Sequence, residues 1–125
     1  TNIKFLGFIS EAEKLKLLSE ADLFCSPALF GESFGIVLLE AMASGTIIVA
    51  GNNPGYAALM RGRGALSLID PKDREDFARR LGLLLNDKVL RAAWCEWAKD
   101  YIEQFNYSHV VDQYEAVYKQ AIKQK

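Results

Sequence analysis

Two glutamates, Glu32 and Glu40, are the residues of this chain best placed to do chemistry, because both lie among glycine, serine and apolar side chains. The stretch Ile36–Ala43 is apolar at every position except Glu40, which predicts a short helix buried on all sides. No residue three or four positions from Glu40 is a cation that could pair with its carboxylate. An unpaired buried carboxylate is costly, so another part of the chain, water or a ligand must satisfy it.

The segment before this helix has the composition of an anion site. Gly31 and Gly35 bracket Glu32, so the backbone can turn tightly and approach a ligand without obstruction from side chains. The first turn of a helix leaves about four amide donors unsatisfied and carries roughly half a positive charge, which favours a phosphate. Helical side chains lean toward the N-terminus, so Glu40 can reach the same region. One site could thus bind an anion on amides and hydroxyls on two carboxylates, as a sugar nucleotide requires.

The spacing of the two glutamates resembles a known signature. In the setting Gly-Glu-Ser-Phe-Gly-Ile-Val-Leu-Leu-Glu-Ala-Met-Ala-Ser-Gly, Glu32 and Glu40 are similar to the Glu-x7-Glu motif of retaining glycosyltransferases of family 4, which have the GT-B fold. The motif sequence, with Ser33 and Ile36 at these positions, most resembles the phosphatidylinositol mannosyltransferase branch of the family. The similarity covers most of the chain, and its further segments are Asn2–Gly7, Ala21–Pro27 and the helices after Asp70.

The resemblance implies a role for each residue of the motif. Glu32 would be the catalytic residue and hydrogen-bond hydroxyls of the donor sugar, and Glu40 would accept hydrogen bonds from the ribose. Backbone amides at the start of the helix would bind the diphosphate, and the loop at residues 7–9 would lie against the nucleobase. The residues implied in substrate binding are Gly7, Phe8, Ile9, Glu32, Ser33, Phe34, Gly35, Ile36 and Glu40.

The reaction implied is transfer of a hexose from a nucleotide diphosphate sugar, such as GDP-mannose or UDP-glucose, with retention at the anomeric carbon. No metal or other cofactor is implied. These enzymes have two Rossmann-like domains, so a full member would be about two to three times as long. The N-terminal acceptor-binding domain and an upstream Arg and Lys that clamp the diphosphate are missing from these 125 residues. We therefore expect residues 1–125 to be part of the C-terminal, donor-binding domain and to be inactive alone.

Composition restricts the partners and the compartment. Half of the residues are apolar, which is typical of one globular domain. The formal charge of −1 gives no excess of positive charge that would attract nucleic acid. No apolar run approaches the roughly 20 residues that span a bilayer, and no secretory signal is visible. Cys25 and Cys95 have neither close spacing nor histidine neighbours. We expect a cytoplasmic protein, peripheral to the inner membrane face only through the absent domain if the acceptor is a lipid.

The first half of the chain alternates strand and helix patterns, which predicts an α/β fold with a Rossmann-like parallel sheet. Ser10 and Glu13 form a capping-box pattern for a helix to about Glu20. Asn52–Gly55 reads as a turn, and Tyr56–Met60 as a short helix. Strands are expected over Ile3–Phe8, Leu23–Ser26, Thr46–Ala50 and Ala65–Ile69.

The second half reads as helical. Asp70-Pro71 predicts the cap and first position of a helix, and apolar stripes then continue to the C-terminus. We expect His109, which follows Ser108, to have a surface or capping role. The aromatic side chains expected in the core are Trp94, Trp97, Tyr101, Tyr107 and Tyr114.

Three loops should converge at the carboxyl ends of the strands, where open α/β sheets bind ligands: residues 7–9, 31–35 and 51–55. The loop at residues 51–55 departs from the Gly-Gly-x-Pro-Glu sequence that is commoner in the family.

The two glutamates also have other interpretations. Glu32 could be a structural carboxylate that interacts favourably with the dipole at the helix N-terminus. Glu40 could be a structural carboxylate that pairs with Arg61 or Arg63. Two carboxylates also suggest a glycoside hydrolase, which needs both exposed in one cleft. A non-catalytic nucleotide-binding or interaction module would have the same scaffold.

Overall fold

A three-stranded parallel sheet is the centre of the fold in the computed structural model, which describes residues 2–124. The strands β1 (Phe24–Ser26), β2 (Ile48–Gly51) and β3 (Leu68–Ile69) lie in the order β1-β2-β3. Every residue of β2 is buried, as expected for a β-branched apolar strand covered on both faces. The predicted α/β class is therefore confirmed.

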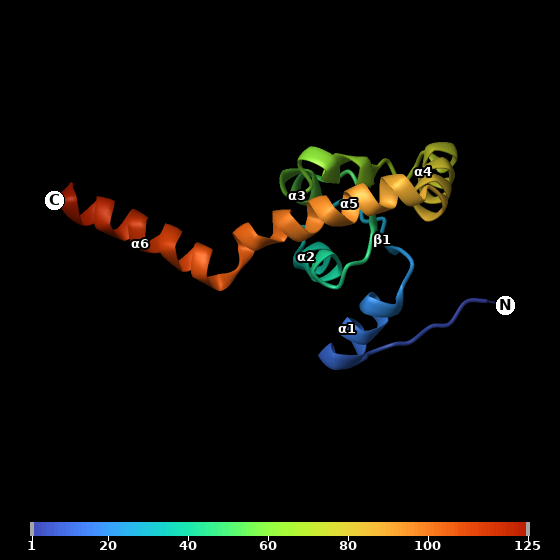
Figure 1. The fold of residues 1–125 in the computed structure, drawn as a ribbon, viewed down its shortest axis with the longest axis horizontal. Helices are drawn as coiled ribbons and strands as arrows, with labels where there is room; N and C mark the ends of the chain where they lie inside the picture. The colour runs from blue at the N-terminus through green and yellow to red at the C-terminus, as the bar shows by residue number, and fades with distance from the viewer. Residues whose placement is uncertain (1, 125) are drawn as a thin grey trace.

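Helices surround the sheet and extend beyond it. Figure 1 shows α5 crossing the body of the molecule, α6 leading away from it, and α1 below it with the N-terminal segment. The helices are α1 (Glu11–Glu20), α2 (Ile36–Ala43), α3 (Pro54–Leu59), α4 (Arg74–Asn86), α5 (Lys88–Tyr101) and α6 (Tyr107–Lys123), with 3-10 turns η1 (Gly62–Ser67) and η2 (Ile102–Phe105). The capping box at Ser10 and Glu13 and the bounds predicted for α2 are confirmed.

The core gathers around β2 and continues into a row of aromatic rings along α5. Trp94 is buried, Trp97 stacks on Tyr101 at 4.7 Å between centroids, and Tyr101 meets Phe105 edge to face. Phe105 in turn contacts the ring of Phe34 at 5.9 Å. This row of rings therefore supports the segment just before α2 from outside the sheet.

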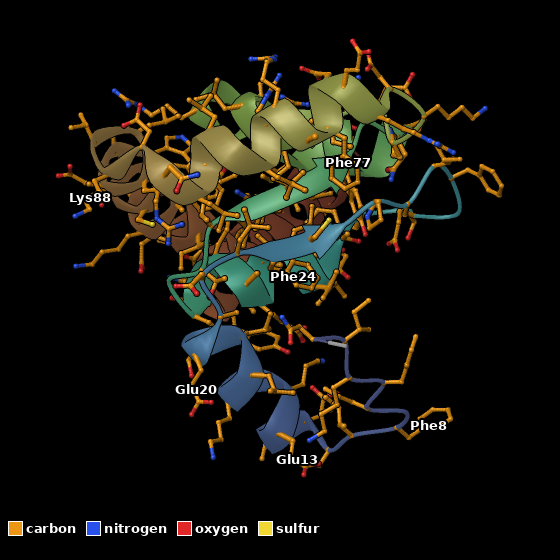
Figure 2. The ribbon with its side chains drawn as sticks, turned by 90° about the vertical axis from the view of Figure 1, so that its right-hand side faces the viewer. Phe8, Glu13, Glu20, Phe24, Phe77 and Lys88 are labelled. Carbon is orange, nitrogen blue, oxygen red and sulfur yellow. The ribbon has the colours of Figure 1, made fainter. Side chains whose placement is uncertain are left out.

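The predicted strand over Ile3–Phe8 is wrong. The segment is not paired with any strand among residues 2–124, and its apolar side chains, Phe5 and Phe8 above all, face solvent. Figure 2 shows Phe8 beside Glu13 at the lower end of the view, away from Phe24 in β1. An isolated extended segment cannot satisfy its amides and carbonyls as a strand does, so the apolar pattern alone does not make one.

Strand β1 begins one residue later and β2 two residues later than predicted, and three further boundaries also differ. The run expected as a strand over Ala65–Ile69 is 3-10 up to Ser67, and only its last two residues pair with β2. The turn at Asn52–Gly55 already contains the start of α3, because Asn53 caps it and Pro54 stands at its first position. Asp73, not Asp70, caps α4 through the amide of Asp76.

The prediction that the aromatic residues of α6 lie in the core is wrong. Tyr107 and Tyr114 are exposed, because α6 projects from the body and buries no residue within the described part of the chain. His109 is exposed too. Its amide donates to the capping side chain of Asn106, and its ring Nδ1 lies 2.8 Å from the carbonyl oxygen of Glu103, so its surface position is confirmed.

Candidate functional site

The N-terminus of α2 is the feature around which the predicted site residues gather. Gly35 is its N-cap and has a φ angle of +92°, a left-handed backbone conformation that residues other than glycine rarely adopt. The Leu38 amide donates to the Gly35 carbonyl, and within residues 2–124 no acceptor lies against the amides of residues 34–36. Gly35 itself is buried, and the exposed residues around it are Glu32, Ser33, Phe34 and Ile36.

Two glycines allow the loop after β1 to pack against the start of α3. A Cβ on Gly35 would lie 2.8 Å from Cδ1 of Tyr56, so the buried tyrosine ring fills the space beneath it. A Cβ on Gly55 would lie 2.3 Å from the carbonyl oxygen of Glu32. The loops at residues 31–35 and 51–55 therefore touch, as the sheet topology predicted.

Asn53 ties the same two loops together, a role that the sequence reasoning missed. Its side chain is buried, its Nδ2 donates to the Ala28 carbonyl at 3.0 Å, and its Oδ1 accepts from the Tyr56 amide at 2.9 Å. A Cβ on Gly51 would lie 2.0 Å from that same Ala28 oxygen. The only sequence signal was the asparagine before proline, which marks a cap but not a contact across loops.

Glu40 is less buried than predicted, and its partner comes from another part of the chain, one of the sources that the sequence allowed. Its side chain is 25% exposed, because α2 is open to solvent on the side of Ile36. Lys14 of α1 satisfies its carboxylate, with Nζ 3.2 Å from Oε1 and 3.1 Å from Oε2. The suggested pairing with Arg61 or Arg63 is wrong, since the ion pair that Glu40 forms among the described residues is with Lys14. The partner thus comes from elsewhere in the chain.

A hydroxyl pair lies beneath the loop that bears Glu32. The hydroxyl oxygens of Tyr56 and Ser26 are 2.7 Å apart, which joins α3 to the last residue of β1. Burial raises the pKa of Tyr56, the hydrogen bond with Ser26 opposes that rise, and the charge and hydrogen bonding of the Glu32 carboxylate add to it. Neither Tyr56 nor Ser26 was predicted to belong to the site.

The third predicted loop, residues 7–9, does not join the other two. Gly7 has φ +64° with open space around it, and Phe8 is fully exposed. Ile9 lines a groove of about 240 Å³ with Lys14, the ion-pair partner of Glu40, and with Phe24. The loop at residues 31–35 and the helix that bears Glu40 are thus continuous, whereas Gly7 and Phe8 of the third loop stand in the open.

Two kinds of feature are absent from the described residues. No group of three or more His, Cys, Asp or Glu side chains in residues 2–124 could hold a metal ion. No helix in this part of the chain is long and apolar enough to cross a membrane.

A parallel sheet with a helix start at the carboxyl ends of its strands is the architecture of α/β ligand-binding domains. Residues 1–101 match the family model described as glycosyl transferases group 1, and the chain belongs to that family.

Similar proteins carry more specific names. The chain is 36% identical over 117 residues to a phosphatidyl-myo-inositol mannosyltransferase of Mycolicibacterium smegmatis, covering 94% of this chain and 30% of that protein. It is 33% identical over 118 residues to a D-inositol 3-phosphate glycosyltransferase of Corynebacterium urealyticum, covering 94% of this chain and 27% of that protein. The chain thus spans less than a third of the length of these curated relatives.

Proposed function

We propose that residues 1–125 form the donor-binding part of a retaining hexosyltransferase of glycosyltransferase family 4. Glu32 binds hydroxyls of the donor sugar and acts in catalysis, and Glu40 accepts hydrogen bonds from the ribose. The observation that supports the proposal is the start of α2, where the amides at residues 34–36 have no acceptor among the described residues and lie in the chain between an exposed glutamate on the loop and a second glutamate on the helix.

The chemistry requires stabilisation of the negative charge that develops on the departing diphosphate. The amides and dipole at the N-terminus of α2 provide part of that stabilisation in a fixed geometry. Glu32 would orient the hexose over the breaking bond, because its backbone is held by the contact with Gly55. That the reaction proceeds without a metal ion stays a prediction.

The name of the mannosyltransferase relative favours a mannosyl donor. We expect GDP-mannose to be that donor, with UDP-glucose as the next candidate. The names of the relatives also favour an inositol-containing acceptor. The acceptor would bind an N-terminal domain outside these residues, and the membrane would be reached through that domain if the acceptor is a lipid. We expect the intact protein to work on the cytoplasmic side.

Calorimetric titration of the intact protein with GDP, UDP, ADP and their sugars tests this function. We expect one nucleotide to bind tightly and Glu40→Ala to weaken it by roughly 1 to 3 kcal/mol, since hydrogen bonds to a charged group are lost. Glu115→Ala, on exposed α6, is the control and should leave binding unchanged. Absence of binding to all three nucleotides would contradict the proposal.

A second candidate is a non-catalytic module in which Glu40 is structural. The ion pair with Lys14 favours it, because that pair already satisfies the carboxylate without a ligand. The same titration separates the two functions. In the module, Glu40→Ala would lower stability but leave any nucleotide affinity unchanged.

A further inference from the structure

Lys14 stands where α1 meets α2 and is shared between two carboxylates. Its Nζ lies 2.8 Å from Oε2 of Glu11, and it lies 3.2 and 3.1 Å from Oε1 and Oε2 of Glu40. An ammonium group has three protons, so these three acceptors engage all of its donors. Lys14 therefore has no donor left for a ligand, and we expect it to act on a ligand through its partners.

The ion pair between Lys14 and Glu40 differs from the others in the described part of the chain. Every other ion pair of residues 2–124 joins side chains three or four positions apart in one helix. Exposed pairs of that kind contribute little, because solvent screens them and the side chains stay mobile. The pair formed by Lys14 and Glu40 instead connects two helices, and both side chains are largely covered.

The packing of α1 holds Lys14 in place. Leu18, one turn further along α1, is buried, and its carbonyl accepts a hydrogen bond from the hydroxyl of Thr46, just after α2. Helix α1 therefore lies beside α2, as Figure 1 shows. The cation is thus fixed against Glu40 by its helix, and this is the kind of support that keeps a binding group in one geometry.

Contact with both oxygens restricts how the Glu40 carboxylate can turn. A carboxylate has about four acceptor positions, and the ammonium group occupies one on each oxygen. About one position on each oxygen stays open, which matches the two neighbouring hydroxyls of a ribose. The ion pair and the binding of a ribose are therefore compatible, and the first prepares the carboxylate for the second.

We propose that Lys14 is a positioning residue that holds the Glu40 carboxylate in the orientation that accepts hydrogen bonds from the ribose hydroxyls. The inference rests on the proposed function, in which Glu40 binds the ribose. It assigns to α1 a part in donor binding, although this helix lies outside the loops that form the site.

The test uses nucleotides with and without the ribose hydroxyls. GDP, UDP and ADP are each titrated beside their 2′,3′-dideoxy forms into the intact protein and its Lys14→Met variant. We expect Lys14→Met to weaken binding of the preferred ribonucleotide about fivefold to tenfold, because the carboxylate loses its orientation. The affinity for the dideoxy form should not change. An equal loss for both forms would overturn the inference, since it would show a general effect of charge or folding.

Two further variants serve as controls. Lys16→Met makes the same change on the same helix, but Lys16 lies 4.0 Å from Glu20 and both side chains are largely exposed. It should leave the affinity for either form unchanged. Lys14→Arg keeps the positive charge and should retain most of the affinity that Lys14→Met loses. The same loss in Lys16→Met as in Lys14→Met would contradict the proposed role.

A double-mutant cycle with Glu40→Ala shows whether Lys14 acts through Glu40. If it does, Lys14→Met has no further effect on ribonucleotide affinity in the Glu40→Ala protein. Additive losses would overturn the inference.

The outcomes also separate this inference from the proposed function. If the wild-type protein binds none of the three nucleotides, the proposed function fails, and the inference fails with it. If a nucleotide binds and Glu40→Ala weakens it, but Lys14→Met does not, the function stands and the positioning role of Lys14 alone is overturned.

Discussion

Lys14 in α1 and Glu40 in α2 form an ion pair in which one ammonium nitrogen lies 3.1 and 3.2 Å from the two carboxylate oxygens. The same nitrogen lies 2.8 Å from a carboxylate oxygen of Glu11. The pair links the N-terminal helix to the helix that forms the site. It also leaves lone pairs on Glu40 that remain available to ribose hydroxyls, because a carboxylate has about four acceptor positions.

Removal of Lys14 should loosen the contact between α1 and α2. We expect Lys14→Met to lower the urea midpoint of unfolding at pH 7, because it leaves a partly buried carboxylate without its cation. Lys16→Met is the matched control, since Lys16 lies 4.0 Å from Glu20 with both side chains largely exposed, and it should change the midpoint little. Equal midpoints for the two variants would contradict the structural role of the pair.

The same pair predicts a loss of stability at alkaline pH. Hydrogen bonds to Glu11 and then Glu40 raise the pKa of Lys14 above its ordinary value of 10.5. A raised pKa in the folded state means that this stabilisation is fully present below pH 10.5 and is lost as the pH rises through the folded pKa. Urea unfolding at pH 9 and 11 should therefore show a smaller decline for Lys14→Met than for wild type. A steeper fall in stability between pH 9 and 11 for Lys14→Met than for wild type would contradict this prediction.

Gly35 should tolerate substitution less well than any glycine with open space around it. Gly35→Ala combines a left-handed backbone with a clash against the Tyr56 ring, which should cost about 2 to 4 kcal/mol of unfolding free energy. Gly31→Ala, with φ +89° but no neighbour within 4 Å, should cost about 1 to 2 kcal/mol. Chemical denaturation measures both. Equal losses would show that the ring does not support the loop.

Asn53 should matter more than an ordinary helix cap. Asn53→Ala removes the cap of α3 and leaves the Ala28 carbonyl unsatisfied, so we expect a loss of about 2 to 3 kcal/mol in unfolding free energy. Asn106→Ala removes the exposed cap of α6 and should cost about 1 kcal/mol. Thermal unfolding of both variants provides the comparison. A cost for Asn53→Ala no greater than the control would mean that its cross-loop bond contributes nothing.

The sequence was sufficient to predict those features whose contacts come from residues close together in the chain. The bounds of α2 follow from a glycine at each end and an apolar run between them, and the start of α1 follows from the Ser10–Glu13 capping box. The buried nature of β2 follows from its β-branched composition. In the candidate site, the order of loops along the chain was sufficient to predict that residues 31–35 and 51–55 meet.

Contacts between distant residues were decided only by the tertiary structure. Ile3–Phe8 has the pattern of a strand, but a strand exists only when a partner pairs with its backbone, and the described residues supply none. Lys14 pairs with Glu40 across 26 positions, and Tyr56 reaches Ser26 across 30. No periodicity encodes such pairs, because they depend on how β1, β2 and their helices pack in space. The sequence by itself therefore determined the motif and the class of fold, whereas packing decided which side chains support the two glutamates.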